Sequence, residues 1–264
     1  MLRIGWIDYL NTLPFNFEKT GIDLGFSYEL VKGFPSQINR FLSEKKVDVG
    51  FISSVHYIQN FNDFLILSDL SISSLNKVKS VVILSEKPLE KISQIYLTKE
   101  SKTSQYLTKI IFKVFLNKNP VYKPLSDEDI ENKEAVLLIG DKAIKFSDRK
   151  KYRYDLSEIW FKETGLPFVF ALWCVRKDYY EKNKDKVKKL NQVLKTSKNR
   201  FFENPEKYIK DQFLINYLKN LDYCLSEEHI KSLKLFSEYL LETGLIKEKP
   251  TFRFIEGKNE AYNF

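Results

Sequence analysis

Short apolar runs alternate with segments of helical spacing from the first residues to about residue 175. Runs typical of strands cover residues 2–7, 24–30, 47–52, 78–84, 95–97, 135–139 and 168–175. Most are rich in β-branched or aromatic residues, which favour strands. Because helical patterns separate most of these runs, the sequence predicts an α/β fold.

The helical segments carry recognisable start and stop signals. They begin near Pro35, Ser54, Ser101 and Asp155, and the one from Asp155 is stopped by residues 165–167 (GLP). Beyond residue 178 the chain reads as helical and highly charged, with helices around 208–218 and 227–241. Gly244 is well placed to end the last of them.

Strands and helices form two blocks, and the chain leaves the first block and later returns to it. We therefore predict two lobes, one made of residues 1–77 and 176–264 and the other of residues 78–175. Two α/β lobes joined by paired crossings enclose a cleft that closes on a ligand by hinge motion. This two-lobed architecture is the type II periplasmic-binding-protein-like fold.

The first strand ends in a polar turn, residues 8–12 (DYLNT), and Pro14 suits the first turn of a helix. Ligands of open α/β sheets bind beyond the carboxyl ends of the strands. Tyr9, Asn11 and Thr12 are therefore expected on the rim of a ligand site. The alternative is that Asn11 only caps the helix, since Asn is a preferred cap residue.

Other strand ends also carry polar residues. Candidates for the same rim are Ser53, Ser54, Thr103, Ser104, Gly140 and Asp141. Hydroxyls and free amides at the start of a helix can hold an anion together. Capping alone, or for Gly140 and Asp141 a simple turn, is the alternative. Ser80 lies near the start of an apolar strand, where a buried hydroxyl needs a partner.

Composition and charge narrow the function classes. The chain has 264 residues, 43% of them hydrophobic, which is enough for a large core, and its net charge is +8. The densest basic stretch, residues 182–189, is interrupted by Asp185 and reads as a solvated helix face. We therefore expect no nucleic-acid partner, whereas a small anionic substrate agrees with the charge.

The sequence shows no secretory signal and no apolar run of the ~20 residues that a membrane span needs. We expect a soluble, cytoplasmic protein with no membrane partner. Cys174 and Cys224 are expected to be free thiols. No Cys/His cluster has metal-ligand spacing and no glycine-rich phosphate loop is present, so neither a metal nor a cofactor is expected. His56 and His229 read as surface residues.

Several short segments, taken in order, resemble the chorismate dehydratase family of the futalosine route to menaquinone. They are residues 9–14 (YLNTLP), 35–40 (PSQINR), 52–55 (ISSV), 71–74 (SISS), 80–81 (SV), 138–141 (LIGD) and 165–171 (GLPFVFA). The resemblance implies a lyase that removes water from chorismate to give 3-[(1-carboxyvinyl)oxy]benzoate. It also implies that Asn11 and Ser80 orient the ring and the leaving hydroxyl, and that the substrate's enolpyruvyl carboxylate takes the proton.

The resemblance leaves two alternatives open. A non-catalytic binding protein for a small carboxylate would share the cleft and the hinge. A 1,4-dihydroxy-6-naphthoate synthase of the same route is expected to use a histidine near the cleft, for which His56 is the one remote candidate. The oligomeric state stays open.

Overall fold

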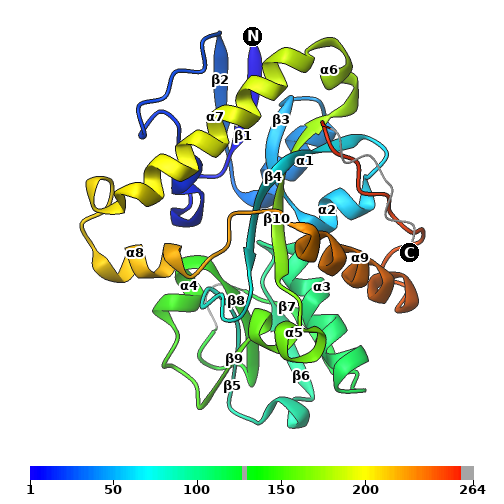
Figure 1. Ribbon diagram of the computed structural model, residues 1–264. Helices are drawn as coiled ribbons and strands as arrows, with labels where there is room; N and C mark the ends of the chain where they lie inside the picture. Colours follow the sequence, from blue (N-terminus) through cyan, green and yellow to red (C-terminus); the bar gives the residue numbers. More distant parts are fainter. Residues whose placement is uncertain (127–129, 257–264) are drawn as a thin grey trace.

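A computed structural model describes residues 1–126 and 130–256, which form two five-stranded sheets (Figure 1). Sheet A has the order β2-β1-β3-β10-β4 and sheet B the order β7-β6-β8-β5-β9. Sheet A contains β1 (Leu2–Trp6), β2 (Tyr28–Lys32), β3 (Val49–Ser53), β4 (Phe64–Ser74) and β10 (Phe168–Arg176). Sheet B contains β5 (Val81–Ser85), β6 (Gln94–Leu97), β7 (Val121–Pro124), β8 (Ala135–Ile139) and β9 (Tyr152–Asp155).

Helices cover both sheets and the level between them. The first lobe carries η1 (Leu10–Phe15), α1 (Pro35–Ser43), α2 (Ser54–Gln59), α6 (Lys177–Lys182) and α7 (Lys184–Glu203). The second carries η2 (Leu89–Lys91), α3 (Lys102–Ile110), a π-helical turn η3 (Ile111–Phe115), α4 (Gly140–Lys145) and α5 (Leu156–Thr164). The remaining helices are η4 (Pro205–Lys207), α8 (Gln212–Lys219) and α9 (Glu227–Glu242). Figure 1 shows α8 and α9 at the level where the two lobes meet.

Local sequence signals explain several of these elements. Strand β8 is buried at every position because it lies between β6, to which it is parallel, and β5, to which it is antiparallel. Helix α5 begins where the Asp155 carboxylate accepts hydrogen bonds from the amides of Ser157 and Glu158, and it ends at Gly165 with a φ of 71°. The pattern predicted α5, and it predicted β8 with its bounds.

The two lobes are joined by an antiparallel pair of long strands, β4 and β10. Phe168 already faces Ser74 in sheet A, and Val175 lies deep in that sheet opposite Leu65. The crossings are therefore residues 75–79 and 165–167, since the Ser80 carbonyl already accepts a hydrogen bond from the Gly140 amide beside sheet B. The sequence division, which placed residues up to 175 in the second lobe, puts the return crossing too late, because an aromatic-rich strand carries no signal of which sheet it joins.

Strand β10 contains a bulge near its start. Val169 faces Ser73 and Ala171 faces Ile72, so Phe170 is an extra residue without a partner on β4. A bulge reverses the alternation of side chains locally and is a common device for turning a residue toward a site. Here it places Phe170 in the cavity between the lobes.

The hydrophobic core is continuous between the lobes. One cluster of buried apolar residues includes side chains from both sheets. Helix α9 contributes to the connection: Phe236 packs edge to face on Trp160 of α5, with 5.8 Å between ring centroids, and Ser232 accepts a hydrogen bond from the Trp160 indole at 3.0 Å. The C-terminal helical part thus contacts the second lobe, although the sequence division assigned it to the first.

Two further sequence predictions, one on the cysteines and one on His229, have opposite outcomes. Cys174 and Cys224 are free, as predicted, one buried and the other exposed. His229, predicted at the surface, is only 4% exposed. It lies in the capping box of α9, where Nδ1 accepts a hydrogen bond from the backbone amide of Ser226. Within the described residues, no helix combines the length and apolar character needed to cross a membrane.

Candidate functional site

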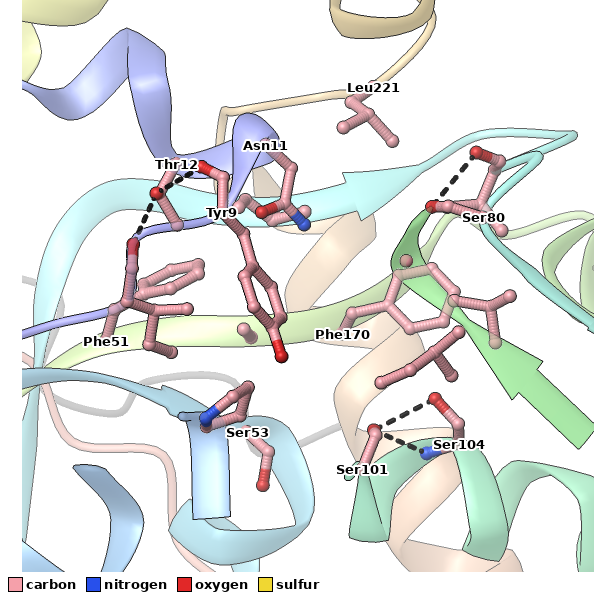
Figure 2. Close-up of a pocket in the computed structure, with 18 of the residues that line it drawn as sticks. Tyr9, Asn11, Thr12, Phe51, Ser53, Ser80, Ser101, Ser104, Phe170 and Leu221 are labelled. Carbon is pink, nitrogen blue, oxygen red and sulfur yellow. Dashed lines mark hydrogen bonds between the residues drawn. The ribbon is translucent and has the colours of Figure 1, made fainter. Parts of the chain in front are cut away.

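A cavity lies between the lobes and is lined by residues of both (Figure 2). Its walls are largely apolar, with a few polar groups from both lobes. The first lobe supplies Tyr9, Asn11, Thr12 and Ser53, and the second supplies Ser80, Ser101 and Ser104. The loop after β1, the start of β5 and the start of α3 therefore converge on one space.

Asn11 does not cap a helix. Helix η1 begins after Tyr9 and has no side-chain cap, while the hydroxyl of Thr12 lies 2.6 Å from the carbonyl oxygen of Ile7 and 2.8 Å from that of Tyr9. Thr12 thus holds the loop, and Asn11 is left to face the cavity (Figure 2). Its Oδ1 atom is buried and has no hydrogen-bond partner among the described residues. Because a buried, unsatisfied acceptor costs ~1–3 kcal/mol, this oxygen is suited to a ligand donor.

Ser80 lines the cavity from the opposite lobe and is 4% exposed. Its backbone carbonyl accepts a hydrogen bond from the Gly140 amide at 2.7 Å, and its hydroxyl oxygen accepts one from the Tyr217 hydroxyl at 2.9 Å. Tyr217 comes from α8, and sequence reasoning missed it. A tyrosine on an apolar helix face gives no signal that separates a site residue from a core residue.

Ser53 is held by a second residue that the sequence did not single out. Asn39 of α1 donates from Nδ2 to the Ser53 hydroxyl oxygen at 3.1 Å, and its Oδ1 accepts from the Ser53 amide at 3.2 Å. The Ser53 side chain does not cap α2. Because Asn39 occupies the oxygen as a donor, the Ser53 hydroxyl proton remains for a ligand in the cavity.

Helix α3 points its first turn at the cavity. Ser101 is its cap and accepts the Ser104 amide at 3.2 Å, and the two hydroxyls lie 2.9 Å apart (Figure 2). Both serines line the cavity, although only Ser104 was predicted there. Hydroxyls beside a helix start can bind a carboxylate, since the helix dipole also favours negative charge there.

Ser54 and Thr103 lie behind the cavity wall, which contradicts their predicted contact with a ligand. Both are fully buried. The Ser54 hydroxyl donates to the Val169 carbonyl at 2.7 Å, and the Thr103 hydroxyl oxygen accepts from the Val55 amide at 3.0 Å. Neighbouring residues point in different directions, so Ser53 and Ser104 reach the cavity, whereas Ser54 faces β10 and Thr103 faces the start of α2. Thr103 thus caps α2 from the other lobe.

We expect Thr103→Val to destabilise the fold by about 1–3 kcal/mol, because the Val55 amide would be buried without an acceptor. Denaturant unfolding measures the change. Thr108→Val is the matched control: Thr108 is equally buried on α3, but its hydroxyl only donates to the Ser104 carbonyl within the helix, at 2.9 Å. Equal stability of the two variants would contradict the capping role of Thr103.

Gly140 and Asp141 occupy different depths. Gly140, with a φ of 58°, lines the inner cavity, and it begins α4 rather than a simple turn. Asp141 lies in the outer mouth, which adjoins the cavity and includes Glu100 and Lys142. Lys142 pairs with Glu100 there at 2.9 Å. Asp141 therefore lies at the entrance of the cavity, and Gly140 lies deeper.

His56 is not part of the cavity lining. Its ring stacks on Phe64 with 5.8 Å between centroids, and Nε2 lies 3.0 Å from the Ser43 hydroxyl. Burial, with the nearby charge of Lys102, lowers its pKa to about 4. His56 is thus a neutral, partly buried residue that packs on Phe64 outside the cavity. In the described part of the chain, no group of three or more His, Cys, Asp or Glu could hold a metal ion.

Sequence comparison relates this chain to enzymes of one pathway. A family model described as menaquinone biosynthesis matches residues 2–242. A chorismate dehydratase of Thermus thermophilus is 28% identical over 244 residues, covering 81% of this chain and 87% of the relative. A chorismate dehydratase of Campylobacter jejuni is 32% identical over 180 residues, covering 66% of this chain and 67% of the relative.

Solved structures confirm the predicted fold. Protein AF1704 from Archaeoglobus fulgidus superposes with a TM-score of 0.71 at 19% identity, covering 93% of this chain and 98% of its own. The periplasmic aliphatic sulphonate-binding protein SsuA of Escherichia coli superposes with a TM-score of 0.67 at 13% identity, covering 94% of each chain. The two lobes and the cleft are thus those of the periplasmic-binding-protein-like fold.

Proposed function

The chain belongs to the menaquinone biosynthesis family, and on that premise we propose that it is a chorismate dehydratase, a carbon–oxygen lyase that converts chorismate to 3-[(1-carboxyvinyl)oxy]benzoate and water. The observation that carries this proposal is the buried, unpartnered Oδ1 of Asn11, which faces a cavity also lined by Ser80. An amide oxygen and a hydroxyl held on two lobes suit a substrate with both donors and acceptors.

The cavity lining offers hydrogen-bonding groups that can position a substrate, but it offers no evident base among the described residues. The inner lining contains no carboxylate and no histidine among the described residues. Asp8 is exposed and pairs with Lys32 at 3.1 Å, and Asp141 lies at the outer mouth. These placements support the role that the family resemblance gives to the substrate's own enolpyruvyl carboxylate.

In this mechanism the carboxylate removes the ring proton while the ring C–O bond breaks. The abstracted proton and the departing hydroxide together make the released water, and the ring gains aromaticity. Asn11 holds the ring and Ser80 donates a hydrogen bond to the leaving hydroxyl. Such positioning, rather than a protein base, supplies the rate enhancement attributed to the chain.

The part of the cavity lined by Ser53, Ser101 and Ser104 suits the carboxylates of chorismate. Ser53 offers its hydroxyl proton, and Ser101 and Ser104 stand at the start of α3. Hydrogen bonds to a charged group are worth ~1.5–3 kcal/mol each.

The cytoplasmic location and the absence of a nucleic-acid partner stay predictions.

One alternative retains support from the structure. The cleft is shared with a sulphonate-binding protein, so a non-catalytic carboxylate binder would have the same architecture. The naphthoate synthase alternative finds less support, because its expected histidine near the cleft is absent from the described lining.

We expect the purified protein to consume chorismate without any added factor and to form 3-[(1-carboxyvinyl)oxy]benzoate in equal amount. Chromatography of the mixture over time measures both compounds, and a protein-free sample corrects for spontaneous decay of chorismate. A binder would leave the chorismate concentration at the level of the protein-free sample, which would contradict the enzyme assignment.

A further inference from the structure

Tyr217 connects the C-terminal helices to the cavity wall. It is 5% exposed, and its hydroxyl donates to the Ser80 hydroxyl oxygen at 2.9 Å. Two neighbours fix the same end of α8: the Asn220 side chain donates to the Lys77 carbonyl, and Leu221 lines the cavity. Tyr217 itself lines the outer mouth together with Asn11 and Gly140. The end of α8 is thus fastened over the crossing from β4 to β5.

This hydrogen bond determines where the Ser80 proton points. A serine hydroxyl has one proton, and Tyr217 already donates to the oxygen. Among the described residues the remaining acceptor for that proton is the Val78 carbonyl at 3.5 Å, the outer limit for a hydrogen bond. The Ser80 proton is therefore held only weakly within the protein and is available to an acceptor in the cavity.

We propose that Tyr217 is a positioning residue for the dehydration: its hydroxyl fixes Ser80 as a hydrogen-bond donor toward the leaving hydroxyl of the substrate. The inference rests on the proposed function. A chain of two hydroxyls strengthens the terminal bond, because each bond polarises the next in a site of low dielectric. Burial raises the pKa of Tyr217 to about 12, so it stays a donor at neutral pH.

The test uses Tyr217→Phe, which removes the hydroxyl and keeps the ring. We expect kcat for chorismate to fall about tenfold, since one neutral hydrogen bond is worth ~0.5–1.5 kcal/mol and 1.36 kcal/mol corresponds to a factor of ten. KM should stay within about twofold, because the ligand contact itself is made by Ser80. A merely structural tyrosine would change the melting temperature without this separation of kcat from KM.

Tyr223→Phe is the matched control. Tyr223 is another buried tyrosine of the same region, and its hydroxyl has no hydrogen-bond partner among the described residues. We expect this variant to keep the wild-type kcat and KM. The same loss of kcat in both tyrosine variants would overturn the proposal.

A double-mutant cycle separates action through Ser80 from an independent effect. Ser80→Ala and the double variant Ser80→Ala/Tyr217→Phe are expected to have the same kcat, because Tyr217 has nothing left to orient. A further tenfold loss in the double variant would overturn the proposal, as would a Tyr217→Phe enzyme with wild-type kcat. If the wild-type protein does not convert chorismate, the proposed function fails, and the inference fails with it.

Discussion

Replacing Asn11 by Asp is expected to lower kcat for chorismate about 10²- to 10³-fold, the usual cost of removing a preorganised polar group from a site. The exchange keeps the size of the side chain but replaces the amide donor with a second carboxylate oxygen. The new charge would face a dianionic substrate in a cavity with largely apolar walls, where repulsion is poorly screened. Product formation by chromatography, beside a thermal melt, measures both consequences.

The melting temperature should barely change, since the Asn11 carbonyl oxygen has no partner within the described residues to lose. Asn16→Asp controls for the added charge: Asn16 follows the same short helix, and its Oδ1 only accepts the Lys19 amide at 2.9 Å, a bond that Asp also makes. An active Asn11→Asp enzyme, or one inactive only because it is unfolded, would remove Asn11 from the site.

Replacing Asp48 by Asn is expected to be the most destabilising exchange proposed for this chain. Asp48 is 2% exposed and accepts two hydrogen bonds from the Arg3 guanidinium, at 2.7 and 3.1 Å. The guanidinium of Arg176 also pairs with the Asp48 carboxylate, with 3.2 Å between nitrogen and oxygen. Breaking a buried ion pair on one side costs ~3–5 kcal/mol, and partial exposure of Arg3 favours the lower end of that range. Denaturant unfolding should show a loss of about 3 kcal/mol.

Asp8→Asn is the control, because the Asp8–Lys32 pair is exposed on both sides and should contribute within ~1 kcal/mol. Asp48 lies just before β3, at the end of sheet A opposite the cavity. The folded fraction of Asp48→Asn should therefore keep the wild-type KM. Stability equal to that of Asp8→Asn would show that the arginines find other partners.

The fold could be predicted from the sequence because the main signals for its elements are local. Strand β8 is a continuous apolar run, and α5 has a cap at Asp155 and a stop at Gly165. The return crossing was misplaced because the partners of β10 are set by contacts with residues about a hundred positions earlier. The short strands β7 and β9 were missed for a related reason, as edge strands of a sheet need little apolar pattern.

The site was predictable where residues follow a strand and less so where packing decides orientation. Tyr9 and Asn11 follow β1, and Ser53 ends β3, which is parallel to β1. In the pairs Ser53–Ser54 and Thr103–Ser104, one residue faces the cavity and the other does not. The sequence does not show which residue of each pair faces the cavity, because that depends on where the other lobe lies.

The cap that Thr103 gives to α2 has a consequence for the timing of the catalytic cycle. The hydrogen bond to the Val55 amide joins the two lobes, so any opening that separates α2 from α3 breaks it. A bond of ~1 kcal/mol favours the closed state by about fivefold. It therefore lengthens the dwell time of whatever is enclosed. Where product escape limits turnover, a weaker cap gives faster cycles and looser retention of the substrate.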